Sequence, residues 1–397
     1  MMERVRIDSS RMGTKGVDLI EELLERVHSV EPPPFARYVP DIEDITAYAE
    51  TIGDVRDLVV LGHGGSITTF KGIYKAFSLG REEKTRVHII DTVDPNFIQT
   101  VRSSLDSKNT HVVAISRSGN TLTVIEMLAA FRGLPTTAVT MTGGNVLRSL
   151  ASVNGWEVVD VPGEIGGRFS GNTASALLPA AVLGLDIARI SRGMEKAYEH
   201  ARKSRDLLDL CGEYYLAERI GKRVLYISVY SKALAGFNDL VTQLVHETLG
   251  KERKGLTALC FEGPECQHHT NQRILDGPED VMTLFVDVDR TEGEKMIWEG
   301  EEGGIELKDV ELKQLGGYDL STAMRAEMWG VMRSMEELEV PFSRITLPGE
   351  DEEDLGFYIG LWHYMAYYSA LLRGVGPFDQ PAVDRAKESA LGYRLGR

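Results

Sequence analysis

The sequence is poor in cysteine and lacks a long apolar run, and these two absences exclude several classes of protein. Its three cysteines, Cys211, Cys260 and Cys266, are an odd number and form no Cys-x-x-Cys pair. We therefore expect neither a disulfide framework nor a cysteine-ligated zinc. No run of 18 apolar residues is present, and the N-terminus leads into polar sequence without the apolar segment of a signal peptide. These features predict a soluble, reduced, cytoplasmic protein with no membrane segment.

The sequence also lacks an excess of basic residues. It has 44 Lys and Arg against 60 Asp and Glu, so its formal net charge is −16, which disfavours non-specific binding to nucleic acid. An anionic ligand would need a local site made of backbone N–H groups and a few cationic side chains. The 397 residues, 43% of them hydrophobic, suffice for a large core and about two or three domains.

Several familiar nucleotide-binding and catalytic motifs are absent. The Gly-rich loop 62–65 does not fit GxGxxG, because Ile67 stands where the third glycine should be, and it lacks the Gly-Lys-Ser/Thr ending of a P-loop. There is no GxSxG. His246-Glu247 is not the start of HExxH, because Gly250 stands at the last position. We therefore expect no dinucleotide or NTP site, no α/β-hydrolase site and no metal.

From about residue 56 onward, short runs rich in Val and Ile alternate with helical patterns. Such runs predict parallel strands that are covered on both faces. The expected strands span 58–61, 87–90, 112–115, 137–141 and 157–161, with helices over 68–78, 96–105, 122–132 and 145–151. A second series has strands over 224–229, 255–261 and 281–286 and helices over 236–250 and 271–275. The pattern predicts an α/β protein with two doubly wound domains, mainly parallel sheets, and helical segments at both ends.

The expected domain boundaries follow from this pattern. We predict an N-terminal helical segment (1–50), a first α/β domain (51–195), a linking helix (196–218), a second α/β domain (219–345) and C-terminal helices (346–397). Within them we expect a helix over 17–30, one long apolar helix over 174–190, an acidic, Gly-rich surface loop or hairpin over 291–317, and an aromatic-rich helix over 355–373. A last helix follows, with Pro381 suited to its first position.

Two loops have the composition of a phosphate site. Ser116, Ser118 and Thr121 surround a predicted helix start directly after a strand, and hydroxyls with helix N-terminal N–H groups suit a phosphate monoester. The alternative is a helix N-cap, which would use one hydroxyl. The Gly-rich loop 62–66 also follows a strand, and its alternative is a tight strand-to-helix turn. Both loops are expected at the carboxyl edge of the sheet, where ligands of doubly wound folds bind.

A carboxylate and a guanidinium are the best candidates for chemistry. Gln243 and Glu247 are four residues apart on a predicted helix, so they share one face. The amide could orient a substrate while the carboxylate takes a proton; the alternative is a solvated face with a Glu247–Lys251 ion pair. Arg168 follows Gly166-Gly167 and could stabilise a developing negative charge. Its alternative is an ion pair with Glu164 or an aspartate.

Two further segments carry possible functional groups. His268 and His269 are predicted to lie in a loop over 267–272, where one histidine could act on a hydroxyl; the alternative is a helix-start or surface histidine. Gln380 and Lys387 are seven residues apart on one face of the last helix. Lys387 could bind the phosphate or the ring oxygen of an anionic sugar, or it could be an exposed surface lysine.

Six motifs carry these groups in a fixed order. They are LGHGGS (61–66), ISRSGNT (115–121), EIGGRFS (164–170), QLVHETLGKERKG (243–255), QHHTNQRILDGPED (267–280) and FDQPAVDRAK (378–387). Together they resemble the glucose-6-phosphate isomerase (phosphoglucose isomerase) family of the sugar isomerase (SIS-domain) superfamily, in its compact archaeal or bacterial form. The resemblance implies two SIS domains that form a cleft, a homodimer, no cofactor, and interconversion of glucose 6-phosphate and fructose 6-phosphate in glycolysis and gluconeogenesis.

The resemblance also implies a role for each matched residue. Glu247 would move a proton between C2 and C1, Arg168 would stabilise the enediolate, and Lys387 with His268 of the partner subunit would open the sugar ring. The implied substrate-binding residues are Gly65, Ser66, Ser116, Arg117, Ser118, Thr121, Gly167, Gln243 and Gln380. The chemistry agrees, because an aldose–ketose shift needs a carboxylate base and a fixed positive charge.

The sequence departs from the family pattern at five positions, and two alternative functions stay open. The departures are His63, Arg117, Asn120, Gly171 and His269. One alternative is a bifunctional phosphoglucose/phosphomannose isomerase of the same fold, which tends to carry Thr near the position of Gln243. The other is a non-catalytic SIS regulator that binds sugar phosphates, which would keep the serine-rich loop but would not need Glu247, Arg168 and Lys387.

Overall fold

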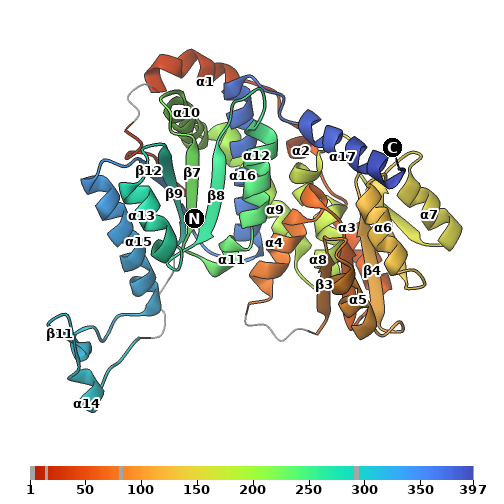
Figure 1. The fold of residues 1–397 in the computed structure, drawn as a ribbon, viewed down its shortest axis with the longest axis horizontal. Coiled ribbons are helices and arrows are strands. Elements are labelled where there is room, and N and C mark those ends of the chain that lie inside the picture. Colours follow the sequence, from red (N-terminus) through yellow and green to blue (C-terminus); the bar gives the residue numbers. More distant parts are fainter. Residues whose placement is uncertain (1–4, 14–16, 80–83, 290–294, 397) are drawn as a thin grey trace.

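The computed structural model describes residues 5–13, 17–79, 84–289 and 295–396. Two α/β units stand side by side, and a long helix, α16 (Glu352–Arg373), runs between them (Figure 1). Each unit contains a five-stranded sheet. This arrangement confirms the predicted α/β class with two doubly wound, mainly parallel sheets. Within the described residues, none of the helices combines the length and the apolar character that crossing a membrane requires.

The first sheet has the strand order β3-β2-β4-β5-β6, and all of its pairings are parallel. Its strands are β2 (Asp57–Leu61), β3 (Arg86–Ile90), β4 (Thr110–Ile115), β5 (Thr136–Met141) and β6 (Glu157–Val161), with helices α4 (Thr68–Phe77), α5 (Pro95–Ser104), α6 (Leu122–Ala130) and α7 (Val146–Asn154). The predicted strands are confirmed within one or two residues. The chain reverses its direction of winding between β2 and β4, and ligands of such sheets bind at this switch point.

The second sheet has the order β1-β12-β9-β7-β8, in which only β1 is antiparallel. It contains β1 (Arg6–Asp8), β7 (Val224–Val229), β8 (Thr257–Glu262), β9 (Val281–Val288) and β12 (Phe342–Leu347), with helices α11 (Lys232–Ala235), α12 (Asn238–Leu249), α13 (Gln267–Asp276) and α15 (Leu320–Glu337). The sequence patterns did not predict β1, β12 or α15. The N-terminal segment thus contributes to the second sheet through β1, and it also holds α1 (Glu21–His28), α2 (Pro34–Arg37) and α3 (Ile42–Ile52).

The prediction of one long helix over 174–190 is wrong. The segment forms α8 (Ala174–Val182) and the beginning of α9 (Ile187–Lys203), and α10 (Asp206–Arg219) follows. Gly184 ends the first helix in a left-handed conformation, with φ of +72°. The Asp186 side chain then caps α9 by accepting a hydrogen bond from the backbone N–H of Arg189 at 3.0 Å. The sequence pattern did not reveal this break because the segment stays mostly apolar across it.

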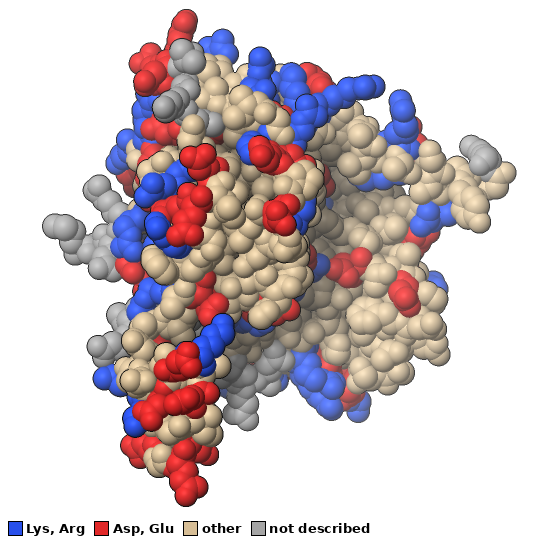
Figure 2. Space-filling view, turned by 60° about the vertical axis from the view of Figure 1, so that its left-hand side comes forward, with Lys and Arg blue, Asp and Glu red and all other residues tan. Residues whose placement is uncertain are grey.

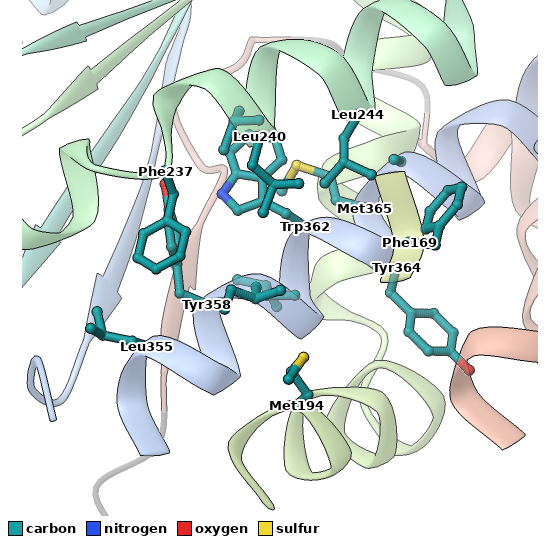
Figure 3. Close-up of a cluster of buried hydrophobic side chains, with 14 of the residues drawn as sticks. Phe169, Met194, Phe237, Leu240, Leu244, Leu355, Tyr358, Trp362, Tyr364 and Met365 are labelled. Carbon is teal, nitrogen blue, oxygen red and sulfur yellow. The ribbon is translucent and has the colours of Figure 1, made fainter. Parts of the chain in front are cut away.

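Helix α16 forms the centre of the core. It is buried on nearly all of its faces, as expected for a helix that is apolar all round. Its side chains pack against α12 and α9. Trp362 and Met365 lie near Leu240 and Leu244 of α12 (Figure 3), and the Tyr358 ring packs against Phe237 at a centroid distance of 5.9 Å. The predicted aromatic-rich helix over 355–373 is therefore confirmed, and it joins the two α/β units into one body.

An arm projects from the second unit (Figure 1). It contains α14 (Gly300–Gly303) and a hairpin of two short strands, β10 (Glu306–Leu307) and β11 (Val310–Glu311). The predicted surface hairpin over 291–317 is confirmed for residues 295–317, and residues 291–294 lie outside the described part. Exposed acidic and apolar side chains share this arm, and Figure 2 shows acidic side chains gathered over the part of the molecule that projects at the lower left.

Candidate active site

A cavity of about 270 Å³ lies at the carboxyl edge of the first sheet, against α12 and the start of α17 (Pro381–Arg394). Loops that follow β2, β4 and β6 meet there. Its walls are formed by His63, Gly64, Gly65, Ser66, Arg117, Ser118, Thr121, Gly166, Gly167, Arg168, Gln243, Glu247, Gln380, Val383 and Lys387. A larger groove, of about 540 Å³, lies far from these motifs near residues 10–13 and 339–342. We assign the candidate site to the smaller cavity because every predicted site residue except Ser116 and His268 lies on its walls.

Arg168 is the most constrained side chain of the site. Only 2% of it is exposed, and all of its nitrogen atoms donate. Nε donates to Thr248 Oγ1 at 2.8 Å, Nη1 to Glu247 Oε2 at 3.1 Å and to Gln380 Oε1 at 2.9 Å, and Nη2 to the carbonyl oxygens of Pro377 and Asp379 at 2.7 and 3.2 Å. Burial lowers the pKa of Arg168, and the Glu247 carboxylate opposes this. A guanidinium nevertheless stays charged, so the site holds a fixed positive charge.

Glu247 lies beside this charge at the end of α12. Leu240 and Leu244 of α12 pack into the core, and Gln243 and Glu247, which follow them by three residues, lie at the edge of that buried face and line the cavity. Gln243 Nε2 donates to Glu247 Oε1 at 2.8 Å, while Gln243 Oε1 accepts from Thr68 Oγ1 at 3.0 Å. Each oxygen of the carboxylate therefore accepts one hydrogen bond, and the Glu247 side chain remains 29% exposed.

The two alternative ion pairs considered from the sequence are not formed. Lys251 contacts Asp379 at 2.7 Å instead of Glu247, and hydrogen bonding from Lys251 lowers the pKa of Asp379. Arg168 pairs with Glu247 and not with Glu164. Glu247 and Arg168 thus contact one another on the cavity wall, where a carboxylate and a guanidinium could act on the same substrate.

The Gly-rich loop after β2 is shaped by a close approach of two backbones. A Cβ atom added to Gly65 would lie 2.2 Å from the backbone N of Arg168 and 2.5 Å from the carbonyl carbon of Gly167. The 3-10 turn η2 (Gly64–Ser66) therefore packs directly against the 3-10 turn η3 (Gly167–Asn172) that carries Arg168. Any residue larger than glycine at position 65 would push the two turns apart.

The loop after β4 leads into the N-terminus of α6. Ser118 and Thr121 line the cavity, and the N-terminal end of a helix favours an anion. Ser116 is buried behind them, and its Oγ lies 2.9 Å from Thr121 Oγ1. The Arg117 side chain also lines the cavity and donates to the carbonyl oxygen of Gly163 at 2.8 Å. Of the three predicted hydroxyls, two lie on the wall and one supports them.

The last predicted residues divide into two groups. Gln380 and Lys387 line the cavity. His268 does not: it is exposed on the first turn of α13, so the prediction that residues 267–272 form a loop is wrong. His269 beside it contacts Glu265 at 3.2 Å. The polar composition of 267–272 indicated a longer loop after the strand. In the structure only residues 263–266 separate β8 from α13, so both histidines lie on the helix.

Several contacting residues were not found from the sequence. Thr248 and Thr68 hold Arg168 and Gln243, and both act across long sequence separations that no local pattern reveals. His63 was noted only as a departure, yet it lines the cavity, and burial lowers its pKa. Gly171, another departure, is tightly packed, because an added Cβ would lie 3.1 Å from the Ile359 side chain. Within the described ranges, no group of three or more His, Cys, Asp or Glu side chains is placed to hold a metal ion.

Known proteins resemble this chain over most of its length. No protein-family model matches the chain. Among curated proteins, a glucose-6-phosphate isomerase from Methanocaldococcus jannaschii is 28% identical over 360 residues, which are 87% of this chain and 86% of that protein. A glucose-6-phosphate isomerase from Thermus thermophilus is 29% identical and covers 87% of this chain and 85% of its own length.

Solved structures agree with this fold. A hypothetical protein from Thermus thermophilus has a TM-score of 0.84 at 26% identity and covers 99% of this chain and 100% of its own. A glucose-6-phosphate isomerase from Chlamydia trachomatis has a TM-score of 0.73 at 20% identity, over 89% of this chain and 72% of its own, and this likeness concerns the fold. Over most of its length the chain is thus similar to curated glucose-6-phosphate isomerases, which confirms the resemblance that the six motifs predicted.

Proposed function

We propose that this protein is an aldose–ketose isomerase that interconverts glucose 6-phosphate and fructose 6-phosphate. The observation that carries the proposal is the contact of 3.1 Å between Arg168 and Glu247 on the wall of a cavity that also exposes Ser118 and Thr121. A carboxylate base, a fixed cation and an anion-binding helix start are the groups this reaction needs. The curated relatives with this name support the same substrate.

The proposed reaction moves one proton along the open-chain sugar. Glu247 takes the proton from C2 of the aldose, the C–H electron pair forms the C1=C2 bond, and the carbonyl π pair moves onto O1. A proton then passes from O2 to O1, and Glu247 returns its proton to C1, which leaves the ketone at C2. No atom or electron is gained or lost. The buried charge of Arg168 stabilises the enediolate between these steps, and Gln243 directs the carboxylate.

We assign the phosphate group of the substrate to the loop at the start of α6. Ser118 and Thr121 would donate hydroxyl hydrogen bonds, with Ser116 aligning Thr121 from behind and Arg117 adding positive charge. Because the protein as a whole carries a net charge of −16, this local group has to attract the dianion by itself. Gly65, Ser66 and Gly167 would lie beside the sugar, and Gln380 beside the phosphate.

We further propose that the protein is a cytoplasmic homodimer and that His268 of one subunit completes the site of the other. His268 is exposed and lies outside the cavity of its own chain, and this supports its delivery to the substrate by another chain. Helix α13, which carries it, packs against α15 at the base of the projecting arm. Exposed Ile297, Trp298 and Trp329 on the arm and α15 supply apolar surface that a partner would cover. Together with Lys387 of the subunit that binds the substrate, His268 of the partner subunit would open the sugar ring.

The direct test is turnover of fructose 6-phosphate by the purified protein after EDTA treatment, coupled to glucose-6-phosphate dehydrogenase. Mannose 6-phosphate is offered in a parallel reaction without added isomerase. We expect turnover of fructose 6-phosphate alone. Turnover of both sugars would assign the protein to the bifunctional isomerases. Turnover of neither sugar, with fructose 6-phosphate still binding, would overturn the enzyme proposal in favour of a sugar-phosphate-binding regulator.

A further inference from the structure

The C-terminal helix α17 holds its place on the molecule with little help from the core. Every described residue of Pro381–Arg394 except Gly392 is exposed. In Figure 1 the helix runs from the centre of the molecule across the first α/β unit, and it ends near α6. Propensity alone does not hold a helix without a buried face against a surface, so the contacts at its two ends help to set its position.

The first of these contacts is the start of the helix. Arg168 donates to Gln380 Oε1 at 2.9 Å and to the carbonyl oxygen of Pro377 at 2.7 Å. Lys251 contacts the Asp379 carboxylate at 2.7 Å. These bonds fix the point at which the chain enters α17, but a single fixed end leaves the rest of the helix able to swing and to roll.

The second contact is an ion pair at the far end. Arg394 donates from Nε to Glu126 Oε1 at 2.5 Å and from Nη2 to Glu126 Oε2 at 2.8 Å. Two parallel bonds between a planar guanidinium and a carboxylate fix direction as well as distance. The pair joins residues 268 positions apart in the chain, so it cannot be a local feature of one helix.

The spacing along α17 connects both ends to the active site. Lys387 is seven residues after Gln380 and seven residues before Arg394. Seven residues are about two turns and about 10 Å of helix, so Lys387 and Arg394 lie on one face of α17, while Gln380 stands directly before its first residue. When Gln380 and Arg394 are both held, the roll of the helix is set and the side chain between them, Lys387, lines the cavity.

Helix α6, to which Arg394 is paired, connects the ion pair to the hydroxyl loop of the site. Glu126 lies in α6, which begins at Leu122 directly after the Ser118–Thr121 loop. We propose that Arg394 and Glu126 are positioning residues that fasten α17 to α6 and so fix Lys387 relative to the hydroxyl loop. The kinetic part of this inference rests on the proposed isomerase function. Neither residue touches the cavity, and both act through Lys387.

The fastening is weak enough to be reversible. The Arg394 and Glu126 side chains are 33% and 36% exposed. An ion pair at such positions shifts the equilibrium between the fastened and the released helix by up to about fivefold. Salt screens them. We therefore expect Glu126→Gln and Arg394→Gln to lower kcat/KM with glucose 6-phosphate by about two- to fivefold, and we expect added salt to lower the activity of the parent protein more than that of either variant.

The experiment combines kinetics with hydrogen exchange on the full-length protein. Hydrogen exchange over 381–394 should be faster in Glu126→Gln and Arg394→Gln than in the parent. Arg385→Gln, which removes the same charge from an exposed position on the same helix, is the matched control and should change neither measurement. The reversed pair Glu126→Arg with Arg394→Glu should restore slow exchange and activity. Unchanged exchange in both single variants would overturn the proposal.

A double-mutant cycle separates a positioning role from a merely structural one. In a Lys387→Met background, Glu126→Gln should have no further effect on kcat/KM, because the residue through which it acts is gone. An undiminished additional loss would show that the ion pair does not act through Lys387 and would overturn the assignment. The exchange measurement needs no substrate, so a parent protein without isomerase activity would refute the proposed function while still testing whether the ion pair fastens α17.

Discussion

Arg168 and Glu247 are 79 residues apart in the chain, and their side chains meet at 3.1 Å. Arg168 lies in the turn after the first sheet, whereas Glu247 ends α12 in the second α/β unit. Gln243 holds the second oxygen of the Glu247 carboxylate at 2.8 Å. The proposed catalytic pair therefore exists only while the two units are packed against one another, and α16 between them maintains that packing.

The first prediction concerns the base. Glu247→Gln keeps the shape of the side chain but cannot accept the C2 proton. We expect turnover to fall at least about a hundredfold, the scale on which a general base contributes, while fructose 6-phosphate still binds. Steady-state kinetics and calorimetric titration measure the two quantities. Glu301→Gln, on the exposed arm, should behave like the parent. Turnover that survives in Glu247→Gln would refute the assignment of the base.

The second prediction concerns the residue behind Arg168. Thr248 is fully buried, and its Oγ1 accepts from Arg168 Nε at 2.8 Å. Thr248→Val keeps the volume but leaves that buried donor without an acceptor, which costs about 1–3 kcal/mol of unfolding free energy. We also expect a lower kcat, because Arg168 loses one of the bonds that aim it. Thr248→Ser retains the hydroxyl and is the matched control. Equal kcat values for the two variants would contradict a positioning role.

A third prediction tests the close approach of the two turns. In Gly65→Ala the new methyl group would lie 2.2 Å from the backbone N of Arg168, so the Arg168 turn must shift. Displacements on the order of 1 Å at an active site reduce turnover by up to about a hundredfold. Gly144→Ala is the control, since a Cβ there meets nothing within 4 Å. Equal kcat/KM in Gly65→Ala, Gly144→Ala and the parent would show that the turns are not rigidly coupled.

Local patterns in the sequence predicted most of the secondary structure. Apolar runs bounded by Gly and polar residues marked β2 to β9, because a buried strand and its turn are encoded within a few neighbouring residues. The same signal failed at residues 174–190, where apolar composition continues through a helix break at Gly184. It also failed at β12 and β1, whose pairing is decided by distant parts of the chain.

Long-range contacts account for what the sequence could not predict at the site. Spacing placed Gln243 and Glu247 on one face, but it favoured a Glu247–Lys251 pair that the structure replaces by partners from other segments, Arg168 and Asp379. Residue type alone could not show that Ser116 lies behind Thr121. Each of these outcomes depends on how separate elements pack, which no single motif contains.

The fourth prediction is a loss of stability in acid. His363 is fully buried, and burial lowers its pKa to about 3. The unfolded chain takes up this proton below its ordinary pKa of 6.5, whereas the folded protein does so only near 3. The contribution is therefore fully present above about pH 6.5 and is lost as the pH falls toward 3, by up to about 1.4 kcal/mol per pH unit.

Chemical denaturation between about pH 7 and about pH 5 measures this dependence. His363→Phe should show a shallower fall of unfolding free energy with decreasing pH than the parent, whatever its stability at neutral pH. His269→Gln is the control, because it removes an imidazole from an exposed position. A fall in His363→Phe as steep as in the parent would show that His363 does not carry the effect. His111, whose pKa burial lowers to about 4, should account for part of the remaining slope.

The last prediction tests whether His268 acts in the site of its partner. Glu247→Gln and His268→Gln should each be nearly inactive as homodimers. In a mixed dimer, the subunit with intact Glu247 receives an intact His268 from the other subunit, so one of its two sites is complete. Random reassociation of equal amounts makes half of the dimers mixed, which should recover about a quarter of the parental activity. If His268 instead served its own chain, every site in the mixture would lack one residue, and mixing would restore nothing.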